Sequence, residues 1–130
     1  MTRFLLLALP ALLLLIAGFH AGWDLLGFDN PQTLPAVQLL GLWFLESFGL
    51  TTLFLLMRGA GRGRFADGIA AAWAAWVFRG PVVVLTLTST TTVTAVGFGK
   101  GPWWNLALGW LGLYTFAGLV LAALARRSDL

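Results

Sequence analysis

The sequence predicts an all-α fold, an integral membrane four-helix bundle, and three observations support this prediction. Hydrophobic residues make up 59% of the 130 residues and charged residues only 10%, which is more apolar surface than a soluble domain of this length can bury. The apolar residues form four long runs, and most charged residues lie between the runs. A helix needs about 20 apolar residues to cross a bilayer, so four spans use nearly the whole chain as a single transmembrane domain.

The first two spans are predicted at residues 4–19 and 35–57. Pro10 is expected to bend the first span. This apolar opening also has the features of a secretory signal, but Phe19 occupies the small-residue position before the best cleavage site, so we expect a retained anchor. The connection at residues 24–34 contains two acids, an Asn-Pro dipeptide and no basic residue, which predicts an exposed turn on the outer side.

The third span leaves two interpretations open, because residues 65–96 as one helix would measure about 48 Å against a hydrocarbon core of about 30 Å. In the first, residues 66–88 span the membrane and Arg79 lies inside it. In the second, Phe65 to Phe78 lies along the cytoplasmic face or is re-entrant, and Pro81 to Phe98 forms the span. We favour the first, because the segment before Arg79 lacks the polar stripe of an interfacial helix.

Basic residues predict the orientation of the bundle, whose fourth span is expected at residues 103–125. Six of the eight basic residues fall on one side of the predicted bundle, and the positive-inside rule then places both termini in the cytoplasm, N-in and C-in.

The high Ala, Gly and Arg content is typical of a GC-rich bacterial genome, so we expect a multi-pass protein of the bacterial cytoplasmic (inner) membrane. The six basic residues on the cytoplasmic side are Arg3, Arg58, Arg62, Arg64, Arg126 and Arg127. The residues predicted to anchor the bundle at the outer interface are Trp23, Trp103 and Trp104.

Two charged residues within the predicted spans are the main candidates for a functional site. Glu46 lies at the centre of the second span, and in the first interpretation Arg79 lies within about 3 Å of the same depth. Charged groups at that depth face the bundle interior and need a partner, so these two are expected to pair. The pair is interpreted either as a structural ion pair or as a polar site, such as a proton relay or a site for a head group or substrate. Small residues at helical spacing lead up to the arginine and predict close helix approach: Gly68, Ala72 and Ala75.

Weaker signals come from a histidine, a hydroxyl cluster and a second set of small residues. His20 lies one turn from Asp24, which allows a hydrogen bond and, in principle, contact with a haem or pigment; the interpretation we favour is an interfacial histidine anchored by the carboxylate. The Ser and Thr residues between positions 86 and 94 could line a polar vestibule, although bonds to their own backbone are the favoured interpretation. Small residues in the fourth span are predicted to pack helices within the bundle: Gly118, Ala122 and Ala125.

The residue inventory excludes several classes of function. The chain has no cysteine and a single histidine, so disulfides, thiol chemistry and the usual zinc sites cannot be built from it. No catalytic constellation is identifiable, and the basic residues lie at span ends, where they indicate topology rather than nucleic-acid binding. The sequence encodes no cofactor site; contact with lipid, quinone or pigment is the kind of cofactor interaction to expect.

The layout resembles the DoxX-like group of small four-helix bacterial membrane proteins. The features that carry this resemblance are Gly18-Phe-His-Ala-Gly22 at the end of the first span, the central acid in Leu45-Glu-Ser-Phe-Gly-Leu50, the Gly/Arg turn from Arg58 to Arg64 and an Ala-rich third span. The resemblance implies a four-helix fold. Because the group includes subunits associated with quinol oxidases, it also implies an accessory function in a redox complex.

Two functions follow as hypotheses. The first is a non-catalytic accessory or structural subunit of a larger bacterial membrane complex, respiratory or photosynthetic, whose partners are other membrane protein subunits and lipids. The second is a small homodimeric transporter or proton-coupled carrier that uses Glu46. An enzyme acting on lipid or quinone ranks last, because the chain offers few groups for acid–base chemistry. Aromatic residues on the spans are expected to offer rigid contact surface to partner helices, pigments or lipid tails: Trp43, Trp73, Trp76, Trp110 and Tyr114.

Overall fold

The structure is a computed structural model and describes residues 1–31, 34–88 and 101–127. Its described part is all-helical, and four helical segments in it are long and apolar enough to cross a membrane. The elements, in chain order, are α1 (Thr2–Leu25), α2 (Ala36–Met57), the short 3-10 helix η1 (Arg58–Ala60), α3 (Arg64–Val77), the π-helix η2 (Phe78–Val82), α4 (Val83–Thr88) and α5 (Pro102–Arg127).

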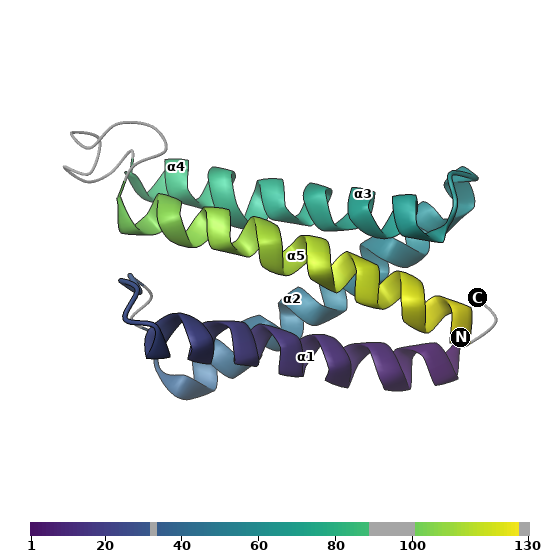
Figure 1. Ribbon diagram of the computed structural model, residues 1–130, viewed down its shortest axis with the longest axis horizontal. Helices are drawn as coiled ribbons and strands as arrows, with labels where there is room; N and C mark the ends of the chain where they lie inside the picture. Colours follow the sequence, from purple (N-terminus) through teal and green to yellow (C-terminus); the bar gives the residue numbers. More distant parts are fainter. Residues whose placement is uncertain (32–33, 89–100, 128–130) are drawn as a thin grey trace.

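The four segments run up and down, and both chain ends lie at the same end of the bundle (Figure 1). α1 contacts α2 and α5, while α3 contacts α2 and α5, and α5 packs most extensively against α3. The first segment passes through Pro10 without interruption. It faces the bundle with one residue per turn, a stripe of buried side chains made by Phe4, Ala8, Leu12, Ile16 and His20.

The third segment is helical from Arg64 to Thr88 without a break, because α3, η2 and α4 follow one another directly. This continuity is what the first of the two interpretations requires, and α3 packs on both α2 and α5 rather than lying apart from the bundle. The second interpretation needs a separate helix from Pro81 to Phe98, most of which lies outside the described residues, as do the hydroxyl residues from 89 to 94.

Small residues set the distance between α3 and α5. A Cβ atom added to Gly68 would collide with the backbone oxygen of Gly118, and one added to Gly118 would collide with that of Gly68. Ala72 and Ala122, one turn further along each helix, complete this contact and are fully buried. The two predicted stripes of small residues therefore pack against each other, because only residues without long side chains allow the backbones to approach so closely.

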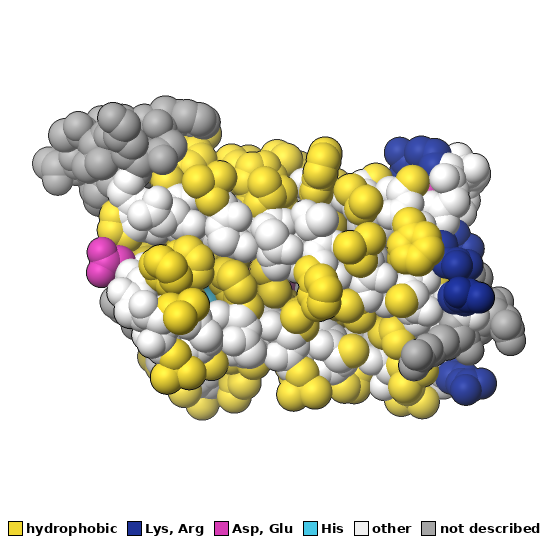
Figure 2. All heavy atoms as spheres, viewed as in Figure 1, with side chains coloured by type: hydrophobic (Ala, Val, Ile, Leu, Met, Phe, Trp, Pro, Cys, Tyr) yellow, Lys and Arg dark blue, Asp and Glu magenta, His cyan; other side chains and the backbone are white. Residues whose placement is uncertain are grey.

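Charge is separated along the bundle. On the face drawn in Figure 2, arginine side chains gather at the end that holds the chain termini, an acidic side chain lies at the opposite end, and hydrophobic side chains cover much of the band between. The basic end includes the α2–α3 turn, where Gly61 and Gly63 adopt positive φ angles of 71° and 93°. Those angles suit glycine, which has no Cβ to clash with the backbone.

Candidate functional site

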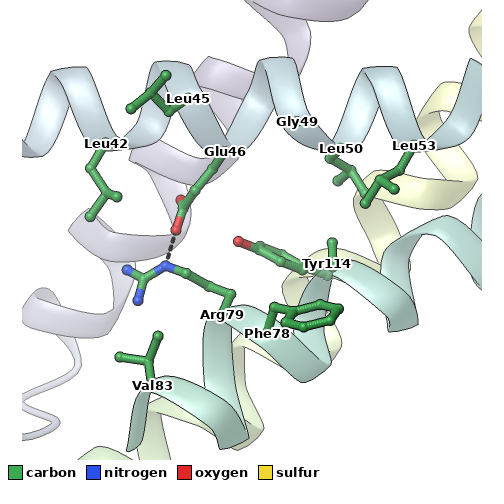
Figure 3. A pocket seen from close by; sticks show the side chains of 11 residues that line it. Leu42, Leu45, Glu46, Gly49, Leu50, Leu53, Phe78, Arg79, Val83 and Tyr114 are labelled. Carbon is green, nitrogen blue, oxygen red and sulfur yellow. Dashed lines mark hydrogen bonds and ion pairs between the residues drawn. The ribbon is translucent and has the colours of Figure 1, made fainter. Parts of the chain in front are cut away.

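The site is built around an ion pair between two helices. The Nε of Arg79, on η2, donates a hydrogen bond to Oε1 of Glu46, on α2 (Figure 3). Both side chains are largely buried, with 14% of the arginine and 7% of the glutamate exposed. The two residues singled out from the sequence thus lie together at the middle of the bundle, where each neutralises the other's charge.

The π-helix positions the arginine. Pro81 has no backbone N–H, so it cannot make the α-helical hydrogen bond to the carbonyl of Val77, and the helix widens at η2 from Phe78 to Val82. Gly80 is buried under the Trp76 ring and Ala107 of α5, and a Cβ atom there would lie only 3.0 Å from Nε1 of Trp76. Trp76 holds this contact by donating a 2.6 Å hydrogen bond from Nε1 to the carbonyl of Ala107.

A second partner of the arginine is an aromatic ring. The Arg79 guanidinium carbon lies 3.9 Å from the centre of the Trp110 ring, a geometry that favours cation–π attraction. Trp110 is 1% exposed and donates a 3.2 Å hydrogen bond from Nε1 to Nε2 of His20. The other histidine nitrogen, Nδ1, therefore carries the proton and donates to the carbonyl of Ile16 at 2.9 Å.

This chain of contacts corrects the expectation for His20. Both ring nitrogens are engaged and the ring stacks on Trp43 at 5.2 Å, so no free nitrogen is available to ligate a haem or pigment. Asp24 does not anchor the ring, because both ring nitrogens have other partners; Oδ1 of Asp24 accepts a 3.0 Å hydrogen bond from Asn30. Within the described residues, no group of three His, Cys, Asp or Glu side chains could hold a metal ion.

The ion pair is only half of the two-bond fork that an arginine and a carboxylate can form. Among the described residues, neither Nη2 of Arg79 nor Oε2 of Glu46 has a hydrogen-bond partner, although both atoms are buried. The hydroxyl of Tyr114 points toward the pair from α5 (Figure 3). Buried polar groups without partners are costly, so the two open atoms mark this place as one that a ligand could complete.

An apolar groove leads to the pair. Its volume is about 330 Å³, and the residues around it come from α2, the third helical segment and α5. Two of these side chains, Leu45 and Phe78, are 65% and 70% exposed, so the groove opens on the outer surface of the bundle, between α2 and η2 (Figure 3). The lining residues are Leu42, Leu45, Glu46, Gly49, Leu50, Leu53, Ala75, Phe78, Arg79, Val83 and Tyr114.

The aromatic residues expected to offer contact surface to partners differ in their exposure. Trp110 and Tyr114 are 1% and 3% exposed, so they belong to the site inside the bundle and offer no surface to a partner. Trp73 is 54% exposed, yet its Nε1 donates a 3.1 Å hydrogen bond to the Thr115 hydroxyl of α5.

The three predicted interface anchors also differ from one another. Trp104 is only 7% exposed, and most of its ring therefore packs inside the bundle. Trp23 packs on Phe28 and donates a hydrogen bond to the carbonyl of Asp29 at 3.2 Å. Trp103 is half-buried against the core.

Asp67 is a buried charged residue that sequence reasoning missed. It lies in the first turn of α3, is fully buried, and pairs with Arg58 at 3.4 Å and Arg62 at 3.6 Å. The signal that could have found it is an acid directly after an arginine-rich turn, at a helix N-terminus where the backbone dipole favours negative charge. Asp67 neutralises part of the basic end and ties the α2–α3 turn to α3.

No protein-family model, curated protein or solved structure matches this chain. The class of protein is therefore defined by the fold and the site alone. Four apolar helices indicate a multi-pass membrane protein, and its distinguishing feature is a buried Glu46–Arg79 pair at the head of an apolar groove.

Proposed function

We propose that this chain is a non-catalytic accessory subunit of a larger bacterial membrane complex, respiratory or photosynthetic, and that it binds a lipid-soluble molecule in the groove beside Glu46 and Arg79. One observation supports the binding function: an open apolar groove ends at a charged pair with unsatisfied hydrogen-bonding atoms. Small-molecule sites typically measure about 300–1,000 Å³ and combine apolar walls with a few polar groups. The groove matches the lower end of that range.

The chemistry of the lining favours binding over catalysis. The two charged groups neutralise each other, and apart from the Tyr114 hydroxyl the other lining side chains are hydrocarbon or glycine. Such a set can orient a polar head group, whereas general acid–base catalysis needs a group that is free to exchange protons with the substrate. The DoxX-like layout points to the same accessory function.

The proposed location is the bacterial cytoplasmic membrane, with the arginine-rich end of the bundle inside the cell. Arg3 lies in the first turn of α1, Arg126 lies near the end of α5, and the α2–α3 turn carries three more arginines at the same end, as the positive-inside rule requires of a cytoplasmic face. The groove then lies near the middle of the bilayer, and its ligand enters sideways from the lipid.

The test of binding uses a photoactivatable alkyl probe, a fatty alcohol with a diazirine in its chain, added to the protein in lipid nanodiscs. Crosslinks are mapped by mass spectrometry and are expected at groove residues of α2 and η2. The variant Gly49→Leu should abolish them, because Gly49 lines the groove and has open space around its Cα. The matched control, Gly41→Leu, lies on the same helix with equal space but outside the groove, and should label like the wild type. Equal labelling of both variants would overturn the binding site.

The accessory function is tested separately, by purifying the protein from its native membrane in mild detergent and identifying co-purifying subunits and small molecules by mass spectrometry. Other membrane proteins in stoichiometric amounts are expected. A protein that runs alone at every detergent concentration would contradict the accessory function.

One observation favours a second candidate, a homodimeric proton-coupled carrier that uses Glu46: one carboxylate oxygen of this residue has no hydrogen-bond partner among the described groups. Such a carrier must break the pair with Arg79 each time the carboxylate takes up a proton. Proton-driven flux into vesicles that contain the purified protein, lost in Glu46→Gln, would favour the carrier; the accessory subunit should show no such flux.

A further inference from the structure

We infer that the groove selects molecules whose head group carries a hydroxyl, which accepts a hydrogen bond from Arg79 and donates one to Glu46. The inference rests on the binding function proposed above and adds the chemistry of the ligand. It starts from the half-formed fork: Nε of Arg79 already donates to Oε1 of Glu46, while Nη2 and Oε2 are both left without partners.

The two atoms without partners need opposite kinds of hydrogen-bonding group from a ligand. Nη2 of Arg79 is a donor and needs an acceptor, whereas Oε2 of a carboxylate is an acceptor and needs a donor. A hydroxyl group supplies both from a single oxygen atom, so it can bridge the pair without separating it. A carbonyl or an ether supplies only the acceptor and leaves the Glu46 oxygen unsatisfied.

Charged head groups fit this pair poorly. A carboxylate or phosphate would be attracted by Arg79 but repelled by Glu46, and an ammonium group would meet the reverse. The pair has no net charge, and a neutral head group therefore avoids uncompensated charge in the apolar interior. Apart from the Tyr114 hydroxyl, which points toward the pair, the remaining walls, including Leu42 and Val83, are hydrocarbon or glycine and suit an alkyl or isoprenoid tail.

The same chemistry has two sources, long-chain alcohols and lipid-soluble hydroquinones, and a competition experiment separates them. The full-length protein in nanodiscs is labelled with the diazirine alcohol, and unlabelled competitors are added in matched pairs. Dodecanol is compared with dodecyl methyl ether, and decyl-substituted hydroquinone with its oxidised quinone. Each pair differs in the hydroxyl hydrogen that Glu46 would accept.

The hydroxyl member of at least one pair should compete about tenfold better than its acceptor-only counterpart, as expected for one hydrogen bond to a charged group. The pair that shows the difference identifies the source. In Glu46→Gln, the amide nitrogen can take the place of the free oxygen and donate, so the preference for the hydroxyl should weaken or reverse.

Two outcomes separate this inference from the binding function on which it rests. Labelling confined to the groove and blocked by Gly49→Leu, with both members of each pair competing equally, would overturn the hydroxyl preference and leave the binding function standing. Labelling outside the groove would overturn both. The comparison on the wild-type protein decides the matter even if Glu46→Gln does not fold.

Discussion

The guanidinium group of Arg79 stacks on the indole ring of Trp110, with 3.9 Å between the guanidinium carbon and the ring centre. This contact joins the Glu46–Arg79 pair to a second buried set of polar groups, because the same indole donates to His20 on α1. Three of the four long helical segments thus meet through Trp110, and the arginine has one partner that balances its charge and another that covers its face.

Replacing Trp110 by Phe should destabilise the protein by about 1–3 kcal/mol, because Nε2 of buried His20 then loses its donor while an aromatic ring still covers Arg79. The free energy of unfolding in mixed micelles measures the effect. In a His20→Leu background the same substitution should cost less, since the acceptor is already gone. Equal costs in both backgrounds would show that the hydrogen bond contributes nothing.

Removing one member of the ion pair should be far more harmful than removing both. Glu46→Leu or Arg79→Met alone leaves an unpaired charge in the apolar interior and should cost about 3–5 kcal/mol of unfolding free energy. The double variant should recover most of this loss, because two apolar side chains of similar size replace the pair. A double variant as unstable as the sum of the singles would contradict a neutralised pair and would indicate packing losses instead.

The close approach of α3 and α5 predicts a sharp difference between two glycines of α5. Gly118→Ala places a methyl group against the backbone of Gly68 and should destabilise the protein by about 1–3 kcal/mol through overpacking. Gly112→Ala, on the same helix with open space around its Cα, should be neutral or stabilising, because alanine favours the helical backbone. Thermal denaturation in detergent compares the two, and similar losses would argue against a tight α3–α5 contact.

The proposed orientation can be tested directly, because the chain has no cysteine of its own. Ala60→Cys, at the arginine-rich end, should react with a membrane-impermeant maleimide only after the cells are opened. Asp29→Cys, at the opposite end, should react from outside in cells whose outer membrane has been made permeable. The reverse pattern of labelling would overturn N-in and C-in.

Apolar runs in the sequence were enough to place three of the helices and to favour one of two interpretations of the third span. The four apolar runs expected at residues 4–19, 35–57, 66–88 and 103–125 lie within or closely overlap the helical segments of the structure. The two stripes of small residues were also visible from spacing alone, and they meet at Gly68 and Gly118. These features can be predicted from local sequence pattern. An apolar run of bilayer length indicates a membrane-spanning helix, and a small residue on each turn indicates close helix packing.

Side-chain partners were harder to predict. Asp24 is the nearest acid to His20 in the sequence, but the histidine bonds to Trp110, 90 positions away. Trp110 and Tyr114 were expected on a contact surface, yet they point inward because α5 packs against both α1 and α3. Which face of an apolar helix is buried cannot be seen when every face is apolar.

By itself, the sequence determined the helical class, three of the four apolar segments and a favoured position for the third. It also singled out Glu46 and Arg79 as charged residues that need a partner. These results follow from composition and from the cost of burying charge. Only the tertiary structure decided that η2 turns Arg79 toward Glu46 and that Trp110 covers the arginine. It also decided that an apolar groove ends at this ion pair. Those relationships arise where separate helices meet, and their geometry depends on packing that no single helix contains.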